Sequence, residues 1–177
     1  MFRFLRTGIL GSFALGALML GSTLVGAASV NQSLTLTAGT LSITGLPTSF
    51  GYSGVLTGDV LTLTSSFSVT VVDATGTKSG WSIQAQTGAL TTTGGDSIPA
   101  ANHSISGVSI SNVMGVGPSN SVITGAIPTT TGKIFNAAAG TGMGQSTMNF
   151  NTQLIVPANA AAGSYSATMT ISIVSGP

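Results

Sequence analysis

The side chains that could take part in acid–base chemistry are few and scattered along the chain. The sequence contains no glutamate and no cysteine, and the candidates for such chemistry are Asp59, Asp73, Asp96 and His103. General acid–base catalysis needs two titratable groups close together, and a zinc site needs several Cys, His or carboxylate ligands. Asp73 stands in the turn-forming run DATG, where its side chain can cap the backbone, and His103 is expected in a loop. We therefore predict a protein that is not an enzyme and holds no metal or other cofactor.

The N-terminal residues have the pattern of a secretory signal peptide. Arg3 and Arg6 precede an apolar run over residues 9–24, and the small residues 25–27 suit a cleavage site. An uncleaved membrane anchor is the alternative. We predict residues 1–27 as the signal peptide and residues 28–177 as a single mature domain. The mature protein is then secreted or on the cell surface, with no membrane contact after cleavage.

The mature part carries almost no charge. Lys78 and Lys133 stand against the three aspartates, so 2 − 3 gives a net charge of −1. A nucleic-acid partner needs a basic surface, so none is expected. Serine and threonine exceed a quarter of the residues and must supply the polar surface. The lack of cysteine excludes disulfides.

The densest apolar cluster predicts two strands at the centre of a β-sandwich. From Leu61 to Val71, apolar and hydroxyl side chains alternate, which places them on opposite faces of a strand. The turn-forming residues 73–80 interrupt the alternation. It resumes over residues 81–86, and the single tryptophan, Trp81, opens this second strand.

Further alternating segments predict the remaining strands, and no segment after the signal peptide has the period of an amphipathic helix. Residues 33–37 and 40–44 are expected as one strand bent at Gly39. The other predicted elements are strands over 105–113, 121–127, 148–156 and 165–173, loops at 129–131 and 137–144, and one helical turn at 158–162. About seven to nine short strands with Gly- and Pro-rich loops predict an all-β, antiparallel, immunoglobulin-like β-sandwich.

Three segments together resemble the WxL domain of Gram-positive cell-surface proteins, over nearly the whole mature chain. They are LTAGTLSITGLP, FSVTVVDATGTKSGWSI and VPANAAAGSYSATMTISIVSGP. The second contains Trp81-Ser82-Ile83, which resembles the family's first Trp-x-Leu motif with Ile83 in place of leucine. The third keeps Tyr165 of the second motif, whereas Ile171 and Ile173 stand where tryptophan and leucine are expected.

The resemblance implies a function as well as a fold. Members of the family are implied to attach non-covalently to peptidoglycan through these two motifs, alongside partner surface proteins. The wall-binding residues that it implies are Trp81, Ser82, Ile83, Tyr165, Ile171 and Ile173. Two interpretations of Trp81 stay open. The favoured one buries the ring in the core, as sandwiches commonly do, and the other stacks it on a sugar.

Two functional hypotheses follow. The leading one is an exported, non-catalytic cell-surface protein attached non-covalently to peptidoglycan or another wall glycan, with other surface proteins or itself as further partners. The alternative is a self-assembling subunit of a surface layer or filament, joined by strand addition at sheet edges. The pairing of residues 33–37 distinguishes the two hypotheses. We expect this segment to pair within its own sheet, for example beside the closing strand over 165–174. A secreted hydrolase ranks far below both.

The signal peptide is directly testable. We expect cleavage after Ala27, so intact mass spectrometry of the secreted protein should give the mass of residues 28–177. A mass that includes residues 1–27 would contradict the assignment.

Overall fold

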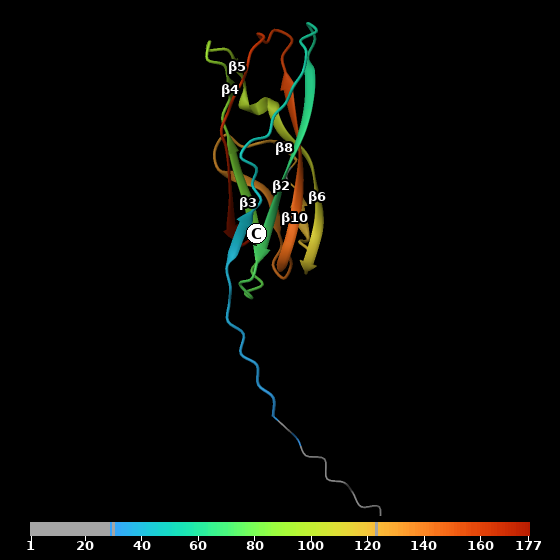
Figure 1. Ribbon diagram of the computed structural model, residues 1–177, viewed down its shortest axis with the longest axis vertical. Helices are drawn as coiled ribbons and strands as arrows, with labels where there is room; N and C mark the ends of the chain where they lie inside the picture. The colour runs from blue at the N-terminus through green and yellow to red at the C-terminus, as the bar shows by residue number, and fades with distance from the viewer. Residues whose placement is uncertain (1–28, 30, 123) are drawn as a thin grey trace, which may run out of the picture. The chain divides into compact units, whose positions relative to one another are not determined.

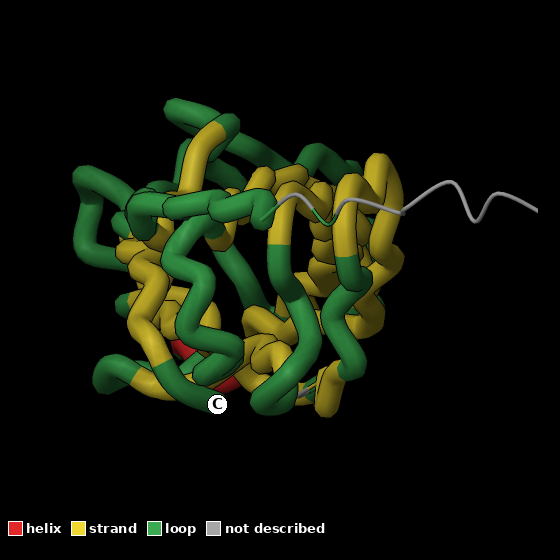
Figure 2. Tube along the Cα trace, turned by 90° about the horizontal axis from the view of Figure 1, so that it is seen from below, coloured by secondary structure: helices red, strands yellow, loops and turns green. Residues whose placement is uncertain are grey.

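The computed structural model describes residues 29, 31–122 and 124–177, and Leu36–Pro177 form one compact unit. The predicted signal peptide lies outside the described residues. The strands are β1 (Leu41–Thr44), β2 (Leu61–Asp73), β3 (Trp81–Thr87), β4 (Leu90–Thr91), β5 (Ser97–Ile98), β6 (His103–Gly115), β7 (Asn120–Val122), β8 (Gly125–Ala126), β9 (Gly132–Ala137), β10 (Gly144–Val156) and β11 (Met169–Ser175). Within the described ranges the one helix is the 3-10 turn η1 (Ala100–Asn102), red in Figure 2.

Two antiparallel sheets contain most of the strands. The five-stranded sheet has the order β1-β2-β10-β6-β8, and the four-stranded sheet has the order β11-β3-β9-β7. β4 and β5 form a separate pair. Figure 1 shows β2, β10 and β6 running side by side. Because every pairing is antiparallel, the predicted all-β, antiparallel sandwich is confirmed.

The strand count is higher than expected because several strands are too short to leave a pattern in the sequence. β4, β5, β7 and β8 have only two or three residues each. β9 is longer, but its neighbouring residues Ile134 and Phe135 are both buried, so it does not alternate. The register of β9 against β3 shifts between Ile83 and Gln84. Such a β-bulge lets two adjacent side chains face the core.

The core forms where the two sheets overlap. β2 and β10 pair without interruption over 13 residues, from Gly144 opposite Asp73 to Val156 opposite Leu61. The inward side chains at the Asp73 end of β2 are fully buried, as the alternation predicted. Phe67 stacks on Phe150 with ring centroids 5.0 Å apart, and Phe150 meets Phe135 of the other sheet edge-to-face at 6.3 Å. These ring contacts join the two sheets.

Trp81 lies inside this core, which confirms the favoured interpretation of its ring. Its side chain is 0% exposed and stacks on Phe135 at 5.7 Å. The indole N–H donates to the carbonyl oxygen of Gly142 at 2.9 Å. Gly142 has φ +70°, and a Cβ atom there would lie 2.6 Å from the indole nitrogen. The glycine therefore lets the loop close over the ring while satisfying its only donor.

Residues 33–37 do not form the predicted strand. In the described part of the chain no strand precedes β1, and β1 pairs with β2 rather than with β11. Leu34 and Leu36 are 81% and 82% exposed. Own-sheet pairing is therefore wrong for this segment. The segment cannot extend the pairing of β1, because β2 ends at Asp73, opposite Leu41. Residues further toward the N-terminus therefore have no β2 edge to pair with.

Three smaller predictions also differ from the structure. His103 lies at the start of β6 and is only 4% exposed, rather than in a loop. Residues 121–127 are divided between the two sheets as β7 and β8. Residues 158–162 make a turn, with the Ala160 N–H bonded to the Pro157 carbonyl at 3.0 Å, and no helix. The capping role of Asp73 is confirmed, since its carboxylate accepts the Thr75 N–H at 3.0 Å.

The two sheets differ in length, and the four-stranded sheet leaves one end of the five-stranded sheet uncovered. β3 and β11 pair over 7 residues, about half of the β2–β10 ladder. Beyond Thr87 and Met169, the inward faces of β2 and β10 meet the short β4–β5 pair and loops instead of the four-stranded sheet. A separate apolar cluster forms there around Ile98, Leu154 and Val156.

The buried tryptophan should be a major contributor to stability. We expect Trp81→Ala to lower the free energy of unfolding by about 3–5 kcal/mol, because it leaves a cavity between the sheets. Val174→Ala on β11 is the matched control, since Val174 is 38% exposed and its loss should cost about 0.5 kcal/mol or less. Denaturant titration measures both. An unchanged midpoint for Trp81→Ala would show that the ring is not part of the core.

Candidate functional site

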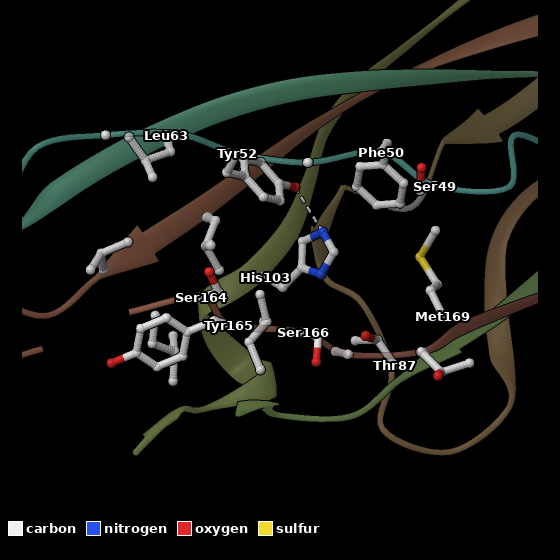
Figure 3. A pocket seen from close by; sticks show the side chains of 18 of the residues that line it. Ser49, Phe50, Tyr52, Leu63, Thr87, His103, Ser164, Tyr165, Ser166 and Met169 are labelled. Carbon is white, nitrogen blue, oxygen red and sulfur yellow. Dashed lines mark hydrogen bonds between the residues drawn. The ribbon is translucent and has the colours of Figure 1, made fainter. Parts of the chain in front are cut away.

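The end of the sandwich that the four-stranded sheet does not cover contains a pocket of about 1090 Å³, here called the open-end pocket. Its floor consists of the inward side chains of β2 and β10: Leu61, Leu63, Leu154 and Val156. Residues 46–56 form one wall and residues 161–169 the other. Figure 3 shows His103 between these walls, with Phe50 and Tyr52 on one side and Ser164, Tyr165 and Ser166 on the other.

A chain of hydrogen bonds runs from the pocket into β10 and β2. The Tyr52 hydroxyl donates to Thr152 Oγ1 at 2.7 Å, and Thr152 donates to the Ser65 carbonyl at 3.1 Å. Tyr52 has one proton to give, so its contact of 2.8 Å with His103 Nε2 requires the histidine to donate. His103 Nδ1 is then a free acceptor. It is buried and has no partner among the described residues.

Burial shifts both ionisable groups toward their neutral forms. Desolvation lowers the pKa of His103 below its ordinary value of 6.5. Desolvation also raises the pKa of Tyr52, against a smaller opposing effect of its hydrogen bond to Thr152. Phe50 and Tyr52 lie 5.9 Å and 5.6 Å from the His103 ring. At neutral pH the pocket is therefore uncharged, and the buried Nδ1 of His103 is an unused hydrogen-bond acceptor in it.

The wall formed by residues 46–56 belongs to a longer segment, residues 45–60, that is held by its side chains. No backbone hydrogen bond joins this segment to the rest of the described chain. Its anchors are the Phe50 ring, which packs on Phe67 at 5.2 Å, and the Tyr52 hydroxyl. β1 covers only Thr70 to Asp73 of β2, so the β2 edge from Leu61 to Val69 has no strand partner on this side.

A second candidate surface is the outer face of the five-stranded sheet. It is defined by the outward side chains of β2, β10 and β6, nearly all of them uncharged hydroxyls or amides: Thr62, Thr64, Ser66, Ser68, Thr70, Thr147, Asn149, Asn151, Gln153, Ser104, Ser106, Ser109 and Ser111. Several are bonded across strands. Thr70 meets Thr147 at 3.0 Å, Asn149 donates to Ser111 at 3.3 Å, and Ser68 donates to Asn149.

A hollow of about 600 Å³ interrupts this outer face. It is lined by Thr64, Ser65, Ser66, Ser106, Asn151 and Thr152. Gly107 stands opposite Asn151 in the register, and a Cβ atom there would meet only the Asn151 amide nitrogen, at 3.8 Å. A larger side chain at Gly107 would therefore project beside Asn151, which lines the hollow.

The six residues proposed from the family resemblance fall in two places. Trp81, Ser82 and Ile83 are each 0% exposed. β11 pairs beside them, with Ile173 opposite Ile83 and Ile171 opposite Ala85, so the two motifs lie side by side on neighbouring strands. Tyr165 lies in the open-end pocket, whose lining also includes Ile171, and its hydroxyl donates to the Ala161 carbonyl at 2.9 Å. Wall binding by these six residues stays a prediction.

Sequence reasoning missed the residues that meet in the open-end pocket. Tyr52 lies in a loop, and His103 and Thr152 lie in two strands. They are 51 and 100 positions from Tyr52 along the chain. One histidine and one tyrosine far apart in the sequence form no motif from which their contact could be predicted. Only the tertiary pairing of β6 with β10, which sets His103 opposite Leu154, brings them together.

The described residues contain no group of three or more His, Cys, Asp or Glu side chains able to hold a metal ion. Within the same residues no helix is long and apolar enough to cross a membrane.

The buried histidine predicts a pH dependence of stability. Because the pKa of His103 is lowered in the folded state, the unfolded chain takes up the proton first as the pH falls below about 6.5. The free energy of unfolding should therefore decrease between about pH 7 and pH 5. His103→Gln, which keeps a donor toward Tyr52, should lose this part of the decrease. Equal pH profiles of the thermal midpoint for both proteins would contradict the prediction.

Comparisons with known proteins bear on the family. No curated protein matches the sequence. Among solved structures, a family 123 glycoside hydrolase from Clostridium perfringens, studied for glycolipid glycan hydrolysis, is similar at 18% identity and a TM-score of 0.36. That match covers 66% of this chain and 18% of the hydrolase chain, so it carries no argument about function. The family described as "WxL domain surface cell wall-binding" matches residues 32–177. The chain therefore belongs to the WxL domain family of surface, cell wall-binding domains.

Proposed function

We propose that this protein is a non-catalytic, exported surface protein that attaches non-covalently to peptidoglycan through the outer face of its five-stranded sheet. The observation that carries the proposal is the uncharged array of hydroxyl and amide groups on β2, β10 and β6, with a hollow beside Asn151. The family match supports wall binding in general.

The array suits a neutral, extended polymer that both donates and accepts hydrogen bonds. Neighbouring strands lie about 4.8 Å apart, and outward side chains repeat about every 6.7 Å along each strand. Cross-strand bonds such as Thr70–Thr147 hold the hydroxyls in place before any ligand arrives. Hydroxyls and amides of a wall glycan can exchange hydrogen bonds with many such groups at once, each contributing little alone.

The motif residues then act through the core rather than by touching the glycan. Trp81 packs on Phe135, Phe135 on Phe150, and Phe150 on Phe67, so ring contacts lead from the motif to the inner side of β10 and β2. Ile173 and Ile171 hold β11 beside the same strand as Trp81. We propose that these side chains and Ser82 keep the sheet in shape, while Tyr165 fixes the loop at the open end.

Filling the hollow tests the proposed face. Gly107→Tyr places a ring among Thr64, Ser66 and Asn151, and should lower the fraction of protein that sediments with purified peptidoglycan by about tenfold or more. Gly88→Tyr is the matched control, since a Cβ atom there meets nothing within 4 Å and Gly88 is exposed outside the face. Equal thermal midpoints exclude misfolding. Parent-like sedimentation of Gly107→Tyr would place binding on another surface, and a parent that does not sediment would contradict wall binding.

Salt tests the neutral mechanism separately. Binding that depends on uncharged hydrogen bonds should change by less than about twofold between about 50 and 500 mM NaCl, because there are few charges to screen. The mature chain has only Lys78 and Lys133 as cations. A tenfold or larger loss of sedimented protein across this range would instead indicate charge-driven binding to anionic wall polymers.

A further inference from the structure

The segment Ser33–Thr37 has the properties of a strand without a partner. Its sequence SLTLT alternates and carries no charge, and Leu34 and Leu36 project on the same side of an extended chain. Both leucines are more than 80% exposed. The described part of the chain contains no strand that pairs with this segment. Exposed, alternating and uncharged segments are the kind that add to the sheet of another molecule.

The open-end pocket has the properties of an acceptor for such a strand. Its floor is apolar, formed by Leu61, Leu63, Leu154 and Val156. The β2 edge beside it, from Leu61 to Val69, offers backbone groups that no strand pairs. His103 Nδ1, buried and unpartnered, accepts a hydrogen bond that nothing in the described chain supplies. The segment 45–60 covering this edge makes no backbone hydrogen bonds that would have to break.

The segment cannot reach the floor of the pocket in its own molecule. Gly39 is fixed beside Ala74, with its N–H on the Ala74 carbonyl at 2.8 Å. From Gly39 the extended chain reaches at most about 11 Å to Leu36 and about 18 Å to Leu34. Leu63 lies eleven residues from Ala74, about 36 Å along β2. Only a second copy can place these leucines in the pocket.

We propose that residues Ser33–Thr37 of one copy insert into the open-end pocket of the next copy, with Leu34 and Leu36 against its floor and their backbone along the free edge of β2. A backbone N–H of the inserted strand donates to His103 Nδ1. The donor leaves one end of the long ladder and the acceptor lies at the other, so the contact is head-to-tail. Such a heterologous contact does not close on itself in pairs and builds an open chain of subunits. This assembly is independent of wall binding by the outer face.

Engineered cysteines test the contact, because the natural chain has none. The secreted protein carries Ser33→Cys on the donor segment and Ser164→Cys at the exposed pocket rim. It is treated with a short bismaleimide, which joins two nearby cysteines. We expect a ladder of covalent multimers in denaturing gels. The control protein carries Ser33→Cys with Ser109→Cys, and its second cysteine lies on the outer face. It should give only the background level of covalent multimers. Absence of a ladder, or an equal ladder in the control, would overturn the proposal.

The leucines supply a second, independent readout. In the Ser33→Cys and Ser164→Cys background, Leu34→Ala with Leu36→Ala should reduce the ladder about tenfold or more, whereas Thr35→Ala with Thr37→Ala should keep it. All four positions are exposed and outside the described strands, so the fold should be unaffected. A ladder that survives the loss of both leucines would exclude insertion into the pocket. Peptidoglycan sedimentation should be the same for both variants, so a failure of assembly and a failure of wall binding are distinguishable.

Discussion

The uninterrupted pairing of β2 with β10 is the constraint on which the rest of the structure depends. These strands stay in register over 13 residues while the opposing sheet covers about half of that length. Alternation along the pair sends mostly apolar side chains inward and mostly hydroxyls or amides outward. Where the second sheet is present, the inward side chains form the core. Where it ends, the same inward positions become the floor of a pocket.

The ring contacts between the sheets explain how the chain keeps its fold with only one tryptophan. Trp81 reaches Phe67 through Phe135 and Phe150, crossing from the four-stranded sheet to the five-stranded sheet. Ile173 stands directly opposite Ile83, and a branched aliphatic pair packs well on neighbouring strands. Ile171 and Ile173 are half-buried and pack against the core cluster that contains Trp81.

The sequence was most informative where alternation was long and the partner strand was present. β2, β3 and β10 could be predicted because their inward side chains form one buried face, and the turn at Asp73 because its carboxylate caps the backbone. Residues 33–37 alternate equally well but have no edge to pair with, since β2 ends opposite Leu41. Pairing is a property of two segments, and a pattern in one of them cannot establish it. The β-bulge at Ile134 hid β9 for a related reason.

The candidate surfaces were only partly predictable. An uncharged, Ser- and Thr-rich exterior follows from composition, but the hollow beside Asn151 depends on the pairing of β6 with β10. The meeting of Tyr52, His103 and Thr152 depends on that register as well, with no local signal in the sequence.

The central claim is that the outer face, and not the open-end pocket, contacts the wall glycan. Backbone amide NMR of the mature protein, titrated with soluble peptidoglycan fragments, tests it most directly. The account predicts shift changes that cluster at Thr64, Ser66, Ser106 and Asn151, around the hollow. Changes confined to Tyr52, His103 and Tyr165 would contradict it, because they would place the glycan in the pocket.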